Sequence, residues 1–302
     1  NVGFSIVPED EGMYTSIWPI LFADEESGVT LHKIDSGIDT GDIVAQKTFK
    51  IENSERSQDC YRKYIESSKE LLSEWFDKII SNEISYVKQA AENSTYFSAK
   101  TIDFLDLEID FNKTAWQVKR QVYAFSFRPY QLLKFKNKQI SDVVIQGCKS
   151  RLKAGTVIYE NNSFITVSTI DHDVSLYFDD LEGFLDDIPK VSLNAFIEGF
   201  VKTLGVNDKN RKGLSPIIVS AYHGRKDLIE YLLENGADIN DRNYRGTTVL
   251  MYAKDFSLKN NDRSFLGFLI NQGADPTLKD WAGKTLLDYI NAEQAELLGL
   301  KI

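Results

Sequence analysis

The stretch GVTLHKIDSGIDTGDIVAQ, from Gly28 to Gln46, crowds acidic residues and glycines between two runs of alternating apolar residues. The residues concerned are Asp35, Asp39, Asp42, Gly37 and Gly41. The alternating runs predict two strands, and the residues between them predict a tight turn in which both glycines adopt positive φ. A turn with this many like charges is either a solvated surface loop or a place where one carboxylate takes part in chemistry.

The residues around this turn, up to about residue 90, indicate part of an α/β unit. NVGFSIV at the start of the chain predicts a strand, and VTLHKI and DIVAQKTFKI predict two more. A long amphipathic helix is expected from about residue 57 to 81, with Ser54 or Ser57 as its cap. Its predicted buried stripe consists of Tyr61, Tyr64, Ile65, Leu72, Trp75, Phe76 and Ile79.

Residues 96–189 predict a helix followed by a small β-rich subdomain. The helix spans about residues 114–124, and four short β-branched runs follow it: VVIQG, TVIYE, SFITVST and DVSLYF. The tripeptide Asp171-His172-Asp173 lies between two of these runs. We interpret it as a hairpin turn rather than as a metal site, because three polar residues in a turn are a weak metal signal.

The last part of the chain repeats itself. Gly213 and Gly246 are separated by 33 residues, and Gly246 and Gly283 by 37, with the extra residues expected as a bulge in FSLKNND, 256–262. The units resemble the ankyrin repeat, with two full copies and a partial third. The resemblance implies left-handed glycines that end helices at Gly224, Gly236 and Gly273, and a structural rather than chemical role for His223.

Composition limits the function classes. The net charge of −10 argues against a nucleic-acid-binding surface, and no apolar run approaches the roughly 18 residues of a membrane span. Cys60 and Cys148 lie far apart, so we expect buried free thiols, no metal site and a reducing cytoplasm. The chain begins at Asn1 without a methionine, and we expect an N-terminal half to be absent.

The N-terminal motif and the aspartate turn together resemble the folate-dependent formyltransferases. The motif residues are Asn1, Ser5, Pro8 and Gly12, followed by GVTLHKIDSGIDTGD from Gly28 to Asp42. The resemblance covers residues 1 to about 130. It implies that formyltetrahydrofolate donates a formyl group to an amine, with Asn1 stabilising an oxyanion and Asp39 orienting a histidine. It also places Asp35, Ile38 and Asp39 near the folate.

One member of the family's catalytic set is missing. The family's histidine position is occupied by Gly3, which cannot move a proton. Because loss of a general acid or base costs about 100- to 10,000-fold in rate, we expect negligible activity from the chain as given. We expect Asp42 to be structural and His32 to be packed or paired within its strand, while Asp35 is as easily a solvated turn residue as a ligand.

Among the formyltransferases, the chain most resembles the sugar N-formyltransferases that act on dTDP-linked amino-dideoxyhexoses for O-antigen and lipopolysaccharide biosynthesis. AFSFRPYQLLKF (124–135) resembles the aromatic segment of that group, so Tyr123, Phe127 and Tyr130 are candidates to stack on a thymine ring. A homodimer is expected from the same resemblance. Two alternatives remain open: a methionyl-tRNA formyltransferase-like enzyme, and an ankyrin scaffold with a decayed transferase remnant.

The repeats have two candidate ligands: a protein partner or a second nucleotide-sugar. The loop-tip residues that either would meet are Arg242, Tyr244, Arg245 and Trp281. The predicted organisation is therefore an α/β chain of three parts. They are the C-terminal part of a Rossmann-like formyltransferase domain (1–94), a β-rich subdomain (95–190), and a linker helix with ankyrin repeats (191–302).

Overall fold

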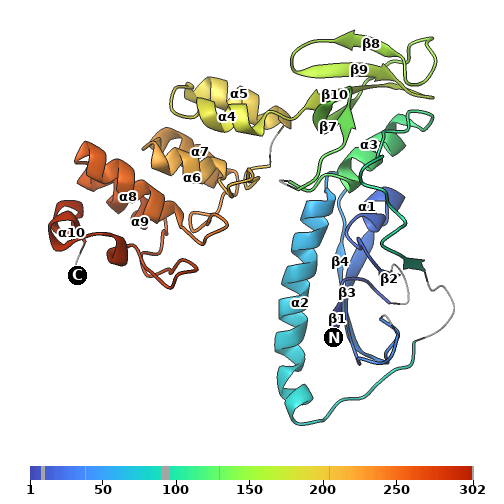
Figure 1. Ribbon diagram of the computed structural model, residues 1–302, viewed down its shortest axis with the longest axis horizontal. Helices are drawn as coiled ribbons and strands as arrows, with labels where there is room; N and C mark the ends of the chain where they lie inside the picture. Colours follow the sequence, from blue (N-terminus) through green and yellow to red (C-terminus); the bar gives the residue numbers. More distant parts are fainter. Residues whose placement is uncertain (8–10, 38, 90–94, 129, 204, 301–302) are drawn as a thin grey trace. The chain divides into compact units, whose positions relative to one another are not determined.

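The computed structural model describes the chain except for residues 8–10, 38, 90–94, 129, 204 and 301–302, and it gives only the backbone of Glu11 and residues 200–203. It divides the chain into two compact units (Figure 1). The first unit contains residues 1–127 and 131–179, and the second contains residues 128–130 and 180–302. The motif residues Pro8 and Ile38 fall outside the described residues.

A three-stranded antiparallel sheet begins the first unit. Its strands are β1 (Val2–Gly3), β3 (Glu26–His32) and β4 (Ile43–Lys50), in the order β1-β3-β4. β3 is the central strand, and every residue after Glu26 in it is buried. A strand buried on both faces must satisfy any polar side chain within the protein, which matters for its last residue, His32.

Two helices belong to this part of the chain, α1 (Trp18–Phe22) and α2 (Ser57–Ile80). Helix α2 runs along β3 and β4 (Figure 1). The extent of α2 was predicted correctly, but most of its predicted buried stripe is wrong. Its buried residues are Ser57, Cys60, Tyr64, Ser67 and Leu71. The exposed ones include Tyr61, Leu72, Phe76 and Ile79.

The N-terminal cap of α2 also differs from the prediction. Arg56, rather than Ser54 or Ser57, is the capping residue, and its backbone N–H donates to Asp59 at 3.0 Å. Ser57 instead donates its hydroxyl to the Ser126 carbonyl at 2.9 Å. Ser57 therefore links the start of α2 to residue 126 and does not cap the helix.

The β-rich part forms a five-stranded antiparallel sheet in the order β6-β7-β10-β9-β8. The strands are β6 (Lys134–Phe135), β7 (Lys138–Ile145), β8 (Val157–Glu160), β9 (Phe164–Ser168) and β10 (Asp173–Phe178). Helix α3 (Ala115–Ala124) packs between β7 and α1. A short parallel pair, β2 (Glu11–Gly12) with β5 (Tyr96–Phe97), completes the unit.

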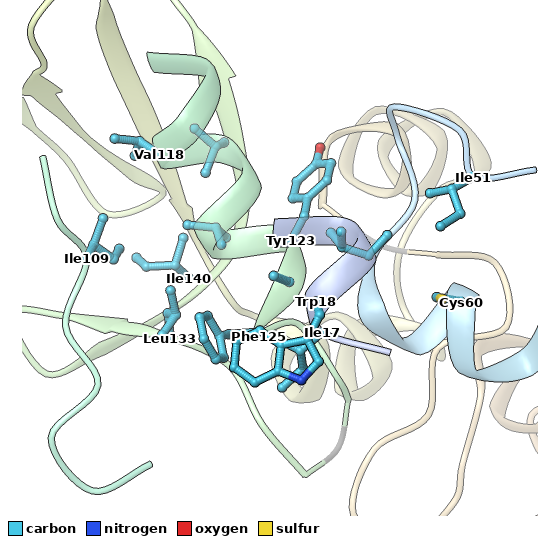
Figure 2. Close-up of a cluster of buried hydrophobic side chains, with 14 of the residues drawn as sticks. Ile17, Trp18, Ile51, Cys60, Ile109, Val118, Tyr123, Phe125, Leu133 and Ile140 are labelled. Atoms are coloured by element: carbon cyan, nitrogen blue, oxygen red, sulfur yellow. The ribbon is translucent and has the colours of Figure 1, made fainter. Parts of the chain in front are cut away.

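One hydrophobic core joins the three-stranded and the five-stranded sheet of the first unit. It includes Trp18 from α1, Cys60 from α2, Val118 from α3 and Ile140 from β7, all of which are drawn in Figure 2. The predicted division at residues 94 and 95 therefore does not separate two cores.

The second unit is helical and has its own core. Its helices are α4 (Leu181–Asp187), α5 (Leu193–Thr203), α6 (Pro216–Tyr222), α7 (Lys226–Glu234), α8 (Val249–Asn260), α9 (Arg263–Asn271), the 3-10 helix η1 (Leu287–Tyr289) and α10 (Ala292–Leu298).

The repeat pattern predicts the glycine conformations of this unit correctly. Gly224, Gly236 and Gly273 have φ of 68°, 88° and 98°, in the left-handed region that ends helices. The expected bulge is wrong: most of the extra residues lengthen α8, which has 12 residues against 7 in α6. Asn261, with φ 54°, then ends this longer helix.

Tyr64 gives a direct test of how α2 is held on the sheet. Its ring is fully buried, and its hydroxyl donates to the Thr15 carbonyl at 3.2 Å and accepts from Ser27 Oγ at 2.7 Å. We expect Tyr64→Phe to lower the free energy of unfolding by about 1–2 kcal/mol, because it leaves buried polar atoms unsatisfied. The matched control Tyr61→Phe, on the exposed face of α2, should change it by less than about 0.5 kcal/mol in urea unfolding.

Candidate active site

The pairing of β1 with β3 brings the first residue of the chain beside the last residue of β3. Val2 lies opposite Leu31, and Gly3 lies opposite Thr30. One step further along, the Asn1 backbone N–H donates to the His32 carbonyl at 2.9 Å, and the His32 N–H donates to the Asn1 carbonyl at 3.0 Å. Asn1 and His32 therefore face each other across the ladder.

A cluster of three side chains forms at this point, and we call Asn1, His32 and Asp39 the NHD cluster. Asn1 Nδ2 lies 3.2 Å from His32 Nε2 and 3.5 Å from Asp39 Oδ1. His32 Nε2 lies 3.4 Å from the same Asp39 oxygen. His32 is buried, whereas the Asp39 side chain is 19% exposed, so the cluster runs from the core of the sheet to its surface.

Gly3 borders this cluster. A Cβ atom at position 3 would lie 3.5 Å from His32 Nε2 and 3.8 Å from Asp39 Oδ1, which is ordinary contact distance. The position that carries a histidine in the formyltransferases is thus adjacent to the imidazole of His32. Packing and pairing were predicted for His32, and both hold, but its partners are the two predicted catalytic residues.

The turn after β3 separates the three aspartates into different roles. Asp35 Oδ1 accepts from the Gly37 backbone N–H at 3.0 Å and from Thr40 Oγ1 at 2.7 Å. The hydrogen bond from Thr40, followed by that from Gly37, lowers the pKa of Asp35. Asp42 lies 3.7 Å from Lys33 Nζ, an exposed ion pair.

The prediction that Gly37 and Gly41 have positive φ is wrong. Neither belongs to the positive-φ residues, whereas Asp39 itself has φ 57°. Glycine is needed at position 41 for a different reason: an added Cβ would lie 1.9 Å from the Lys33 carbonyl oxygen. The chain on either side of the turn comes too close there for any side chain.

Gln89 fixes the same turn from outside. Its Nε2 donates to the Asp39 carbonyl at 2.6 Å and to the Gly41 carbonyl at 2.8 Å. The strained left-handed conformation of Asp39 is thereby held by two hydrogen bonds from one side chain. Nothing in the sequence spacing signals this residue.

The three aromatic candidates for substrate stacking have different surroundings. Tyr123 is buried in the core (Figure 2), its hydroxyl donates to Asp142 at 2.7 Å, and burial raises its pKa well above the usual range. Its ring therefore presents no open face to a ligand. Phe127 is half-buried with its ring edge-on to Tyr61, and Tyr130, in the second unit, is 76% exposed.

The remaining sequence candidates behave mostly as structural groups. Cys60 is buried, and burial raises its pKa to about 12, but Cys148 is exposed, so the prediction of two buried thiols is half wrong. Asp171 accepts from the Ala115 N–H at 2.7 Å, as a turn residue does. Within the described residues, no three His, Cys, Asp or Glu side chains are grouped to hold a metal ion. Across the same residues, no helix combines the length and apolarity that crossing a membrane requires.

Comparison with known proteins finds a family match in each of two parts of the chain. Residues 1–75 match the formyl transferase family, and residues 192–280 match ankyrin repeats. The N-terminal part of the chain is therefore similar in sequence to formyl transferases. The NHD cluster lies within it, and the predicted ankyrin module is confirmed.

Solved structures similar to the chain include two sugar N-formyltransferases. One is WlaRD, a sugar 3N-formyl transferase crystallised in the presence of dTDP and 5-N-formyl-THF. It is 34% identical, with a TM-score of 0.53, over 59% of this chain and 64% of that one. The other is the N-formyltransferase from Helicobacter canadensis in complex with folinic acid and dTDP-3-aminofucose. It is 33% identical, with a TM-score of 0.53, over 59% and 65%.

Similar curated proteins include methionyl-tRNA formyltransferases. The one from Borrelia duttonii is 28% identical over 76% of this chain and 65% of its own length. The one from Lachnospira eligens is 26% identical over 56% and 55%. The chain spans about half to two thirds of the length of these relatives.

The close approach at Gly41 predicts a large effect of a small substitution. We expect Gly41→Ala to lower the free energy of unfolding by about 1–3 kcal/mol, because the turn must move away from the Lys33 carbonyl. Gly147→Ala is the control, since an added Cβ there meets nothing within 4 Å. Equal urea midpoints for the two variants would contradict this account of the turn.

The Asp35 hydrogen bonds predict a pKa change and its sign. Thr40→Val removes the largest cause of the lowered pKa, so the pKa of Asp35 should rise towards its ordinary value. A lowered folded-state pKa contributes stability above the unfolded pKa, which is lost as pH falls through the folded value. Carboxyl ¹³C NMR should show Asp35 titrating at a higher pH in the variant than in the wild type, and Thr48→Val should leave the pKa of Asp35 unchanged. Because the pKa of Asp35 in the variant lies closer to its unfolded value, its contribution to stability is smaller and is lost at a higher pH.

Proposed function

We propose that the protein containing this chain is a cytoplasmic N-formyltransferase that acts on a dTDP-linked amino-dideoxyhexose, in the synthesis of O-antigen lipopolysaccharide. The formyl donor is formyltetrahydrofolate. The observation that carries this proposal is the NHD cluster, because it gathers an amide donor, an imidazole and a carboxylate at the edge of a sheet within formyl transferase sequence.

These three groups match the needs of the reaction. The donor supplies the formyl carbon and the leaving nitrogen. The bond from that carbon to the acceptor amine forms as the bond to the folate nitrogen breaks, and one proton passes from the amine to the folate nitrogen. Asn1 can donate an N–H to the formyl oxygen as negative charge develops on it. Asp39, at the surface of the cluster, can hold the proton in transit.

The turn also fits the donor. Asp35 is exposed and Asp39 partly exposed, so both can accept N–H groups of a pterin ring, and Ile34 next to them is 83% exposed. An exposed apolar side chain beside two carboxylates suits a flat ring with polar edges. Ile38, the third candidate, lies outside the described residues.

An amino sugar is a better acceptor candidate than a charged tRNA. The net charge of −10 disfavours a nucleic-acid surface, and the two sugar N-formyltransferases are more similar in sequence than the methionyl-tRNA enzymes named above. A methionyl-tRNA formyltransferase-like activity is the second candidate, because those relatives match up to 76% of the chain.

For the ankyrin repeats we propose a protein partner, with a second nucleotide-sugar as the alternative. Trp281 is 69% exposed, and the Arg242 guanidinium lies 5.4 Å from its ring centre. A preformed aromatic–cation pair at the loop tips suits either ligand. A homodimer formed through the β-rich subdomain is part of the same proposal.

Enzyme assays with formyltetrahydrofolate test the main proposal. The full-length protein should formylate a dTDP-amino sugar, detected by mass spectrometry, and should leave methionyl-tRNA unmodified. Asn1→Ala and Asp39→Asn should each lower kcat by about 100- to 10,000-fold.

The matched control is Asp42→Asn, which alters an exposed carboxylate of the same turn outside the cluster. We expect its kcat to stay within about threefold of the wild type. Formylation of methionyl-tRNA alone would overturn the sugar assignment. Absence of transfer to both acceptors would favour the scaffold alternative, for which calorimetry would detect binding of a macromolecular partner only.

A further inference from the structure

The hydrogen atoms of the His32 ring are fixed by its surroundings. His32 Nδ1 lies 2.9 Å from the Lys33 carbonyl oxygen. A carbonyl can only accept, so Nδ1 must carry the hydrogen. In the neutral ring, Nε2 is then bare and can only accept.

This tautomer dictates which end of the Asn1 carboxamide faces the cluster. A bare Nε2 needs a donor, and Asn1 Nδ2 supplies one at 3.2 Å. The second N–H of the same amide points to Asp39 Oδ1 at 3.5 Å. Both N–H groups of Asn1 are thus engaged within the protein, and neither is available to a developing oxyanion.

Protonation of His32 reverses this arrangement. An imidazolium has a hydrogen on Nε2 and cannot accept, so it must release the Asn1 N–H. Its new hydrogen can go to Asp39 Oδ1, already 3.4 Å away, or to the Asn1 amide oxygen once the amide rotates. Either outcome frees an Asn1 N–H for another acceptor.

We propose that His32 is a positioning residue whose proton, taken up at Nε2, releases the Asn1 amide to stabilise the oxyanion of formyl transfer. The proposal rests on the proposed function. It also removes the reason to expect negligible activity, because that expectation assumed that Gly3 leaves no imidazole beside Asp39. His32 supplies one from the adjacent strand.

Two of the charged groups near the His32 ring are carboxylates of the turn after β3. Asp39 Oδ1 lies 3.4 Å from Nε2, and the Asp35 carboxylate interacts with the ring through space. The nearby positive group is the Lys33 ammonium, which lies 3.7 Å from Asp42 Oδ2 and 3.3 Å from the centre of the Tyr86 ring. On β4, His32 pairs with the apolar residue Ile43.

Kinetics of His32→Gln in the full-length protein test the catalytic part. Glutamine can hydrogen-bond with Asn1 and Asp39 but cannot take up a proton. We expect kcat to fall by about 100-fold or more with KM within about threefold, and the decline of kcat with rising pH that reflects loss of the His32 proton to disappear. The control His172→Gln, in the exposed β9–β10 turn, should keep the wild-type rate and pH profile. A His32→Gln variant with kcat within threefold of the wild type would overturn the proposal.

Nuclear magnetic resonance tests the same proposal without any turnover. In ¹⁵N-labelled wild-type protein, neutral His32 should be protonated at Nδ1, and the Asn1 side-chain amide signals should shift with the midpoint of the His32 titration. In His32→Gln that shift should vanish. Protonation of the neutral ring at Nε2, or Asn1 signals that ignore the titration, would overturn the proposal. If the wild type transfers no formyl group, the proposed function fails, while these spectra still decide the His32–Asn1 coupling.

Discussion

The pairing of two residues of β1 with β3 is the constraint on which the site depends. It is short, yet it fixes the register, and a shift of one residue would turn Asn1 away from His32. Two backbone hydrogen bonds between Asn1 and His32, one donated by each residue, add to this restraint. The strand register therefore places the Asn1 side-chain amide beside the His32 imidazole.

The rest of the first unit holds β3 still. Tyr64 of α2 bonds Ser27 at one end of the strand, and Gln89 fixes the turn that follows its other end. Because the groups of the NHD cluster contact one another at 3.2–3.5 Å, small movements of the turn would break these contacts. The close approach at Gly41 limits such movements.

The sequence predicts local features of this chain better than packing. Alternation predicts β3 and β4, helical periodicity predicts the length of α2, and the repeat period predicts the ankyrin unit. Tyr64 was predicted on the buried face of α2, but three of the five buried residues are Ser57, Cys60 and Ser67, small side chains that a search for large apolar residues does not find. Which face a helix buries depends on its neighbours, which a periodic pattern does not contain.

The site shows the same division. Asn1 and Asp39 are candidates from the motif, and their proximity is what the structure adds. His32 is hard to identify from sequence because its role depends on the register of β1. Gln89 is hard to identify because it belongs to a segment that lies far along the chain from the turn it binds.

Hydrogen-bond accounting links these residues into one chemical unit. A buried imidazole must satisfy both ring nitrogens, and here one partner is a carbonyl that can only accept. The hydrogen of the neutral ring therefore lies on Nδ1, and this tautomer orients the Asn1 amide so that an N–H faces Nε2. Under our proposal, a proton on Nε2 then frees that N–H to bind another group. Glycine at position 3 leaves these hydrogen bonds intact, because none of them involves a side chain at that position.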